Sequence, residues 1–197
     1  MMRPDPSAQA TGRLLDEYLV AAARAGDRRA FADLVRRWNR RLIAHAWRLT
    51  GSDDMARDAA QAAWLEIVRG LGRLADERAF PAWAYRIVSR RCAREIAAVR
   101  DRRRLAAAVV AEPPVDAPGP DPDAGDETRR LHAAVRALPP PQRAAVALYH
   151  FEELSIAEIA VALDVPAGTV KTRLMHARRA LRAALEGEDN DGSQPPR

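Results

Sequence analysis

The sequence predicts an all-α protein, built as two small helical domains joined by an extended acidic linker. Of the 197 residues, 48% are hydrophobic, 30% are charged and only 5% are aromatic, a balance more typical of helical than of all-β proteins. The apolar residues on both sides of the linker recur with the 3.6-residue period of a helix, and none alternate as in a strand. A proline-rich stretch separates the two periodic regions.

The charges divide the chain into the same parts. Residues 12–104 hold 21 arginines against 12 acidic residues, and residues 129–187 hold 9 basic against 5 acidic residues. Residues 105–128 hold 6 acidic residues, no basic one and five prolines, which remove backbone donors and disfavour helix. We therefore expect two basic domains on either side of this tether, with residues 1–11 and 188–197 lacking regular structure.

Four helices are expected in the first domain, 12–104. The apolar residues at 14–22 and at 31–49 mark the first two, and Arg48 lies off the apolar stripe of the second. Ser52, a good N-cap residue, opens a third helix that runs to about Leu71. A fourth helix is expected to begin near Phe80, since the proline that follows is tolerated in a first helical turn.

The expected third helix carries a polar face with one apolar residue. Asp58, Gln61 and Leu65 project away from the apolar face, which contains Trp64, Ile67 and Val68. An exposed leucine beside two polar side chains suits a docking surface for another protein. A solvated helix face with one stray leucine fits the periodicity equally well.

The expected fourth helix carries arginines at a four-residue spacing. Arg86, Arg90 and Arg94 share a face that is separate from the apolar stripe. Guanidinium groups pair well with phosphate oxygens, so this row favours a phosphate-bearing polymer over an ordinary solvated face. Cys92 belongs to the apolar stripe and is expected to be a small core residue rather than a nucleophile.

The second domain, 129–187, contains the pattern of a helix-turn-helix. Ser155 and Glu158 form a capping box at the start of a short helix, which breaks at residues 164–168 and is followed by a second helix. The outward face of this last helix carries side chains suited to base edges and phosphates, namely Lys171, Thr172, Arg173, Met175, His176, Arg178, Arg179 and Arg182. A purely structural helical hairpin is the alternative, which the capping box and the turn composition make weaker.

The sequence predicts no metal, no cofactor and no enzyme. A single cysteine excludes an internal disulfide and a cysteine-based zinc cage, and the four histidines are scattered. There is no glycine-rich phosphate loop, no cluster of histidine with acids and no nucleophile–base pair. No apolar run approaches the roughly 18 residues that cross a bilayer, and residues 1–10 form no hydrophobic signal segment, which predicts a cytoplasmic protein.

Particular segments resemble a known family. The second domain carries LPPPQR at 138–143, LSIAEIA at 154–160 and LDVPAGTVKTR at 163–173, and these resemble the promoter −35-reading domain of bacterial sigma-70 family factors. The first domain, through segments 56–65 and 80–87, is similar to the core-binding and −10-reading domain of that family. With only these two domains and a short linker, the chain resembles an extracytoplasmic-function (ECF) sigma factor.

The resemblance implies a role for each helix face. The third helix would dock on core RNA polymerase through Asp58, Gln61 and Leu65. The fourth helix would engage −10 promoter DNA through Trp83, Arg86, Arg90 and Arg94. The last helix would read the −35 element through Lys171, Thr172, Arg173, Met175, His176, Arg178 and Arg179.

The linker would then run through the RNA exit path of the polymerase, where an acidic chain suits a channel built for nucleic acid. Its roughly 24 residues reach at most ~80 Å when extended. A promoter spacer of about 17 base pairs spans ~58 Å, so the linker is long enough to let both domains reach their elements.

The implied partners are core RNA polymerase, promoter DNA and a separate anti-sigma protein. Two alternatives stay open. A stand-alone helix-turn-helix regulator would explain the last two helices but leaves the Leu65 face and the linker unused. A sigma-like protein that occupies polymerase without initiating transcription is compatible with Arg57, Ala62 and Arg90, which depart from residues common in the family.

Overall fold

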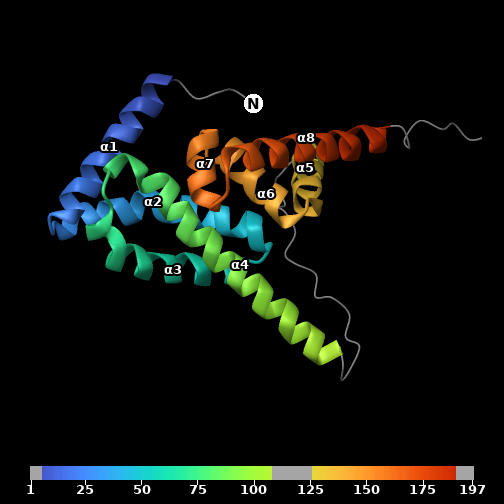
Figure 1. Ribbon diagram of the computed structural model, residues 1–197, viewed down its shortest axis with the longest axis horizontal. Coiled ribbons are helices and arrows are strands. Elements are labelled where there is room, and N and C mark those ends of the chain that lie inside the picture. The colour runs from blue at the N-terminus through green and yellow to red at the C-terminus, as the bar shows by residue number, and fades with distance from the viewer. Residues whose placement is uncertain (1–5, 108–125, 190–197) are drawn as a thin grey trace, which may run out of the picture.

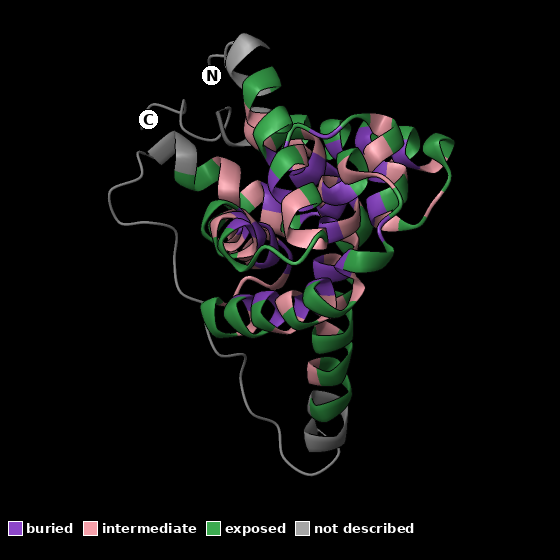
Figure 2. Ribbon diagram, turned by 90° about the vertical axis from the view of Figure 1, so that its left-hand side faces the viewer, coloured by how far each residue is buried: buried purple, intermediate pink, exposed green. Residues whose placement is uncertain are grey.

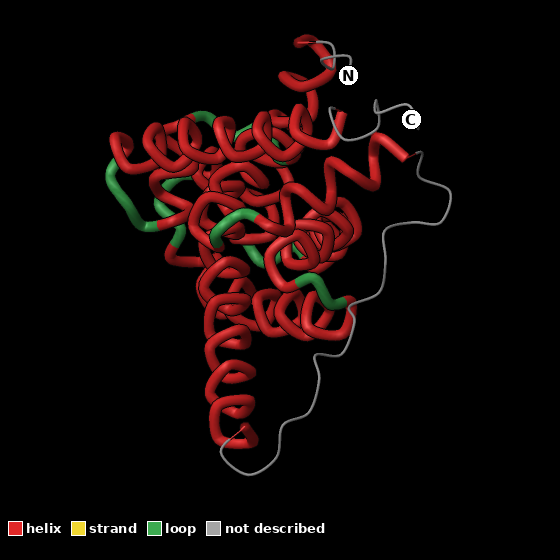
Figure 3. The backbone as a smooth tube through the Cα atoms, turned by 90° about the vertical axis from the view of Figure 1, so that its right-hand side faces the viewer, coloured by secondary structure: helices red, strands yellow, loops and turns green. Residues whose placement is uncertain are grey.

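The structure, a computed structural model, describes residues 6–107 and 126–189, and every regular element within these ranges is a helix (Figures 1 and 3). The prediction of an all-α fold is therefore confirmed. We call the helices before the gap the N-terminal bundle and those after it the C-terminal bundle.

The N-terminal bundle is built from four long helices. They are α1 (Pro6–Arg24), α2 (Arg28–Thr50), α3 (Asp53–Gly70) and α4 (Phe80–Ala107), with short 3-10 turns η1 (Leu71–Arg73) and η2 (Glu77–Ala79) before α4. The expected boundary between α2 and α3 is confirmed: Gly51 adopts the left-handed conformation that ends α2, at φ 71°, and the Ser52 hydroxyl accepts a hydrogen bond from the Met55 N–H.

The C-terminal bundle is built from shorter helices. They are α5 (Asp126–Ala137), α6 (Pro140–Val146), α7 (Ile156–Leu163) and α8 (Ala167–Asp189), with a π-helical turn η3 (Ala147–Phe151) that continues α6. Packing among them is closest between α6 and α8 and between α7 and α8.

Four helix boundaries differ from the sequence expectation. Helix α1 begins at Pro6, inside the segment 1–11 that was expected to lack regular structure, because proline fits the first turn of a helix. Helix α4 continues to Ala107 and α5 begins at Asp126, so that helix enters both ends of the expected linker. Alanine and arginine, which dominate the end of α4, are strong helix formers. Helix α8 runs to Asp189, inside the segment 188–197 that was also expected to lack regular structure. The rest of the expected linker and residues 190–197 lie outside the described ranges.

The core of the N-terminal bundle is aromatic. The Trp38 ring meets Phe80 edge-on at 5.2 Å between centroids and Tyr85 at 5.7 Å. Its indole N–H donates to the buried Asp16 carboxylate at 3.0 Å, and Arg37 donates to the same oxygen at 2.5 Å. Trp38 thereby ties α1, α2 and α4 together.

The two bundles pack directly against each other. Helix α7 lies on α4, and α6 lies on α2. The buried residues concentrate where the helices cross, whereas the distal half of α4 projects from the body and is largely exposed (Figure 2). Both DNA-reading candidates, α4 and α8, therefore belong to one packed unit.

Candidate nucleic-acid interface

The helix-turn-helix forms as the sequence predicts. The Ser155 N–H donates to Glu158 Oε2 at 2.7 Å while the Glu158 N–H donates to Ser155 Oγ at 3.2 Å, which closes the capping box at the start of α7. At the end of α7, Asp164 takes a left-handed conformation with φ 56° and ψ 48°, and the next N–H, of Val165, donates back to Ala160 O. This sharp turn leads directly into α8.

Helix α8 is held by its apolar stripe and leaves a basic face to solvent. Val170, Leu174 and Ala177 are buried against the bundle. Six of the seven side chains predicted to read the −35 element are exposed on the other sides of the helix: Lys171, Thr172, Met175, His176, Arg178 and Arg179. Met175 is the most apolar of these and is 60% exposed.

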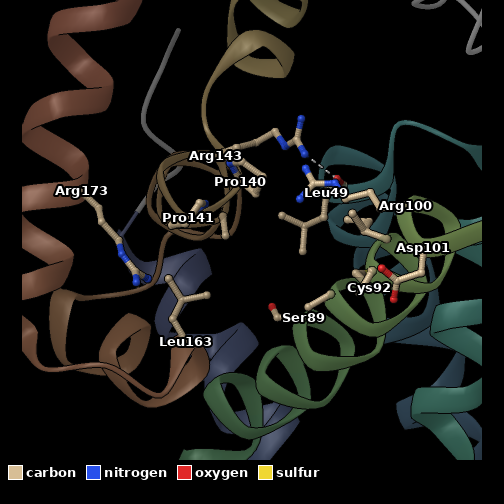
Figure 4. A pocket seen from close by; sticks show the side chains of 14 residues that line it. Leu49, Ser89, Cys92, Arg100, Asp101, Pro140, Pro141, Arg143, Leu163 and Arg173 are labelled. Carbon is tan, nitrogen blue, oxygen red and sulfur yellow. Dashed lines mark hydrogen bonds between the residues drawn. The ribbon is translucent and has the colours of Figure 1, made fainter. Parts of the chain in front are cut away.

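Arg173, the seventh predicted residue, lies differently. Its side chain is half-buried and points toward α4 and α6, into the space between the bundles (Figure 4). In this arrangement Arg173 is turned away from the exposed face of α8, a difference that the helical period alone does not reveal because half-buried positions flank every apolar stripe.

A hollow borders the exposed face of α8. It has a volume of about 400 Å³ and is lined by Tyr149 and Ile156 together with α8 side chains that include Lys171, Met175 and Arg179. The Arg178 guanidinium lies 5.6 Å from the centre of the Tyr149 ring, a cation–π contact that orients it along this face. The basic side chains that line the hollow give it the positive charge that favours a nucleic-acid backbone.

The predicted −10 residues lie along one side of α4. Arg90 and Arg94 are exposed, but Arg86 pairs with Asp164 of the helix-turn-helix at 2.9 Å. Trp83 is half-buried beside Phe80, with its ring over Gly70. A Cβ atom at Gly70 would lie 2.8 Å from the Trp83 ring, so glycine is needed there for this packing.

The predicted docking stripe of α3 is exposed as expected. Asp58, Gln61 and Leu65 share one face, and Leu65 is 55% exposed. Val68 extends this stripe and is also 55% exposed, although the sequence placed it in the apolar face. The inward positions at this end of α3 are filled by Ile67 and Leu71, and Val68 lies three residues beyond Leu65 on the same side.

A cavity of about 920 Å³ lies between the two bundles, beside their direct contacts (Figure 4). Its walls come from α4, including Ser89 and Cys92, from the prolines at the start of α6, and from Leu163 at the end of α7. Burial raises the pKa of the Cys92 thiol to about 12, so the group stays protonated and unreactive. The expectation that Cys92 is a buried residue of the core is confirmed.

Two further side chains beside these surfaces have shifted pKa values. Burial, and next the charge of Arg178, lower the pKa of His150, which keeps this histidine neutral near pH 7. Burial and the neighbouring Arg136 lower the pKa of Arg143 from its very high usual value, and its guanidinium keeps its charge.

The described ranges contain no group of three or more histidine, cysteine, aspartate or glutamate side chains placed to hold a metal ion. Among the described helices, none combines the length and the apolar character needed to span a membrane.

Comparison with known proteins identifies relatives along most of the chain. The family model of Sigma-70 region 2 matches residues 34–104, and that of Sigma-70, region 4 matches residues 128–181. The chain is 39% identical over 179 residues to the ECF RNA polymerase sigma factor SigM of Mycobacterium tuberculosis, covering 90% of this chain and 87% of SigM. It is 30% identical over 182 residues to the RNA polymerase sigma-H factor of Pseudomonas aeruginosa, covering 87% of this chain and 94% of that relative.

Two solved structures resemble the fold. CnrH, in complex with the cytosolic domain of CnrY, superposes with a TM-score of 0.64 at 25% identity, covering 88% of this chain and 98% of CnrH. The sigma factor RpoE from Bartonella quintana, in complex with the anti-sigma factor NepR, gives a TM-score of 0.62 at 21% identity, covering 79% of this chain and 96% of RpoE.

Proposed function

The chain belongs to the extracytoplasmic-function sigma factors of the sigma-70 family, and from this premise we propose which of its surfaces carries each task of such a factor. It binds core RNA polymerase and directs promoter-specific initiation of transcription. The observation that carries the assignment of surfaces is the exposed basic face of α8, presented by a complete helix-turn-helix.

The −35 element is assigned to α8. Lys171, Thr172, Met175 and His176 would reach base edges, because they are exposed along the face that a major groove admits. Arg178 and Arg179 flank them and suit phosphate oxygens. Arg173, which lines the cavity between the bundles, would join this surface only when the two bundles separate.

The −10 element is assigned to α4. Arg90 and Arg94 are exposed and available for phosphates, and Trp83 offers an aromatic ring at the start of the helix. Arg86 belongs to the same row but has the Asp164 carboxylate as its partner in this structure.

Core polymerase is assigned to the α3 stripe of Asp58, Gln61, Leu65 and Val68. Two apolar side chains that are each 55% exposed, next to polar neighbours, form the mixed surface typical of a docking site. We propose 12–104 and 129–187 as the two functional domains.

The remaining partners follow from the relatives. In their solved structures CnrH is bound by the cytosolic domain of CnrY, and RpoE is bound by the anti-sigma factor NepR. These complexes support an anti-sigma protein as a partner of the present chain. We place the chain in the cytoplasm, where core polymerase and promoter DNA are, and assign it no catalysis of its own.

Run-off transcription with core polymerase and genomic templates tests this function. We expect specific transcripts that are absent without the chain, and Leu65→Arg should weaken core binding about tenfold or more, because it places a charge in the apolar part of the docking stripe. Leu14→Arg, at a leucine of α1 that is 65% exposed, is the matched control. Polymerase that co-purifies without any specific transcript would indicate a non-initiating protein, and tight promoter binding without polymerase would indicate a stand-alone regulator.

A further inference from the structure

A buried carboxylate joins the two bundles. Glu152 follows the π-helical turn of the C-terminal bundle, and its side chain is only 4% exposed. Its partners all come from the N-terminal bundle: the Tyr85 hydroxyl donates a hydrogen bond to Oε2, Arg48 Nη1 donates to Oε1 at 2.8 Å, and Arg41 Nε lies 3.6 Å from Oε2. A charge removed from water in this way must be paired, and Glu152 is paired entirely across the boundary.

Other polar contacts surround this carboxylate. Arg143 of α6 donates to the Leu49 carbonyl at the end of α2, at 2.8 Å. Arg86 of α4 pairs with Asp164, whose side chain is 70% exposed, at the rim of the boundary. The Arg48 guanidinium also lies 4.2 Å from the centre of the Phe151 ring. The boundary therefore depends on arginines from both bundles, each of which meets an acceptor of the other bundle.

Such a boundary is suited to opening. A buried ion pair contributes little net stability, because the attraction between its charges mostly offsets the cost of removing them from water. When the bundles separate, water can solvate Glu152 and Arg48 again. Removing only one partner while the bundles stay closed is much more costly, because a charge is then left buried without compensation. Polar contacts between domains are typical of pairs that move relative to each other.

The closed arrangement is incompatible with reading both promoter elements. Arg86, assigned to the −10 element, lies 2.9 Å from the turn of the helix-turn-helix that is assigned to the −35 element. The two elements on a promoter are separated by a spacer of ~58 Å. Arg173 is also turned toward the N-terminal bundle. Both helices can contact their elements together only after the bundles part.

We propose that Glu152 is a latch that holds the free chain closed, and that core polymerase must part the bundles before both promoter elements can be read. This inference rests on the proposed function of α4 and α8. The latch lowers the apparent affinity for core polymerase, since only the open fraction of the chain is competent to bind in the productive arrangement.

The test uses the full chain with Glu152→Gln, Arg48→Gln and the double variant. Small-angle scattering of the free chain measures the radius of gyration, and a fluorescence assay measures the dissociation constant for core polymerase. Asp33→Asn is the control, since it removes a carboxylate whose partner, Arg36, lies on the same helix. Circular dichroism checks that helix content is retained.

For each single variant we expect a larger radius of gyration and a dissociation constant for core polymerase that is lower by about fivefold or more. The double variant should show no further change, because both substitutions remove the same contact. The control should match the unmodified chain.

An unchanged radius with intact helices would overturn the latch, as would opening without tighter core binding. Loss of helix content in the Glu152→Gln chain would also overturn it, since Glu152 would then support the fold of its own bundle. Failure of the unmodified chain to bind core polymerase would instead contradict the proposed function, because scattering of the free chain reports on the latch independently.

Discussion

His45 is a titratable residue buried completely inside the N-terminal bundle. Its Nε2 lies 2.9 Å from Ser89 Oγ, and its ring meets Tyr85 at 5.0 Å between centroids. Its Nδ1 atom is buried without a hydrogen-bond partner. Burial first, and then the charge of Arg48, lower the pKa of His45 from 6.5 to about 3. The folded chain therefore holds His45 neutral.

Acidification should destabilise the chain through His45. Below pH 6.5 the unfolded chain protonates this histidine while the folded chain does not, so the unfolded state binds more protons. The free energy of unfolding should fall by about 1.4 kcal/mol for each pH unit between about 6.5 and 3 because of this group. Urea unfolding at several pH values measures the effect, and His45→Gln should show a shallower loss. Equal slopes for both chains would contradict the assignment.

Exposure at single positions was predictable only in part. The sequence placed Leu65 on the polar side of α3, and it is exposed, but it also placed Val68 with the apolar residues, and that prediction was wrong. The sequence predicted only that His45 does not bind a metal, and it did not predict that this residue lies on the buried side of α2. Period identifies the centre of a helix stripe well and its edges poorly, because the edges depend on how far the neighbouring helix extends.

Helix α8 combines two kinds of contact with DNA, and they should be separable. Lys171→Ala should change which −35 sequence is preferred, since a lost base contact costs about 1–3 kcal/mol at one position. Arg178→Ala should weaken binding to all sequences about equally, because a phosphate contact carries no sequence information. Binding of the holoenzyme to a library of −35 variants measures both effects. A uniform loss from Lys171→Ala would assign that residue to the backbone instead.

The helices themselves were predictable because local signals mark them. Ser52, Ser155 and Asp164 act as the caps and turn residues that the sequence indicated. The contacts between helices were not predictable in the same way. Arg48 was placed correctly off the apolar stripe, but its partner Glu152 is 104 residues further along the chain, and no local pattern links two such positions.

At the scale of the whole molecule, α4 extends a row of arginines away from the body. Arg94, Arg100 and Arg102 are exposed on the part of this helix that projects from the body (Figure 2). The net charge of the chain is +5, and the exposed arginines of this projecting end lie where duplex DNA can approach.

Non-specific binding of duplex DNA should therefore depend on this end of α4. The logarithm of affinity falls with the logarithm of salt concentration by about 0.9 for each phosphate contacted, so Arg100→Gln with Arg102→Gln should make the slope shallower by about 2. Fluorescence anisotropy across a range of NaCl concentrations measures it. Arg28→Gln with Arg29→Gln, at the exposed start of α2, is the control. The same slope for both double variants would show that α4 is not the contact.

Asp164 serves the local backbone and the long-range architecture at once. A glycine would relax its left-handed conformation, which costs other residues about 1–2 kcal/mol, but would remove the counter-ion of Arg86. Aspartate therefore carries a backbone strain in the turn and gains an ion pair with a distant helix. A single substitution at position 164 can therefore change both the backbone of the turn that leads into the DNA-reading helix and the ease with which the two bundles separate.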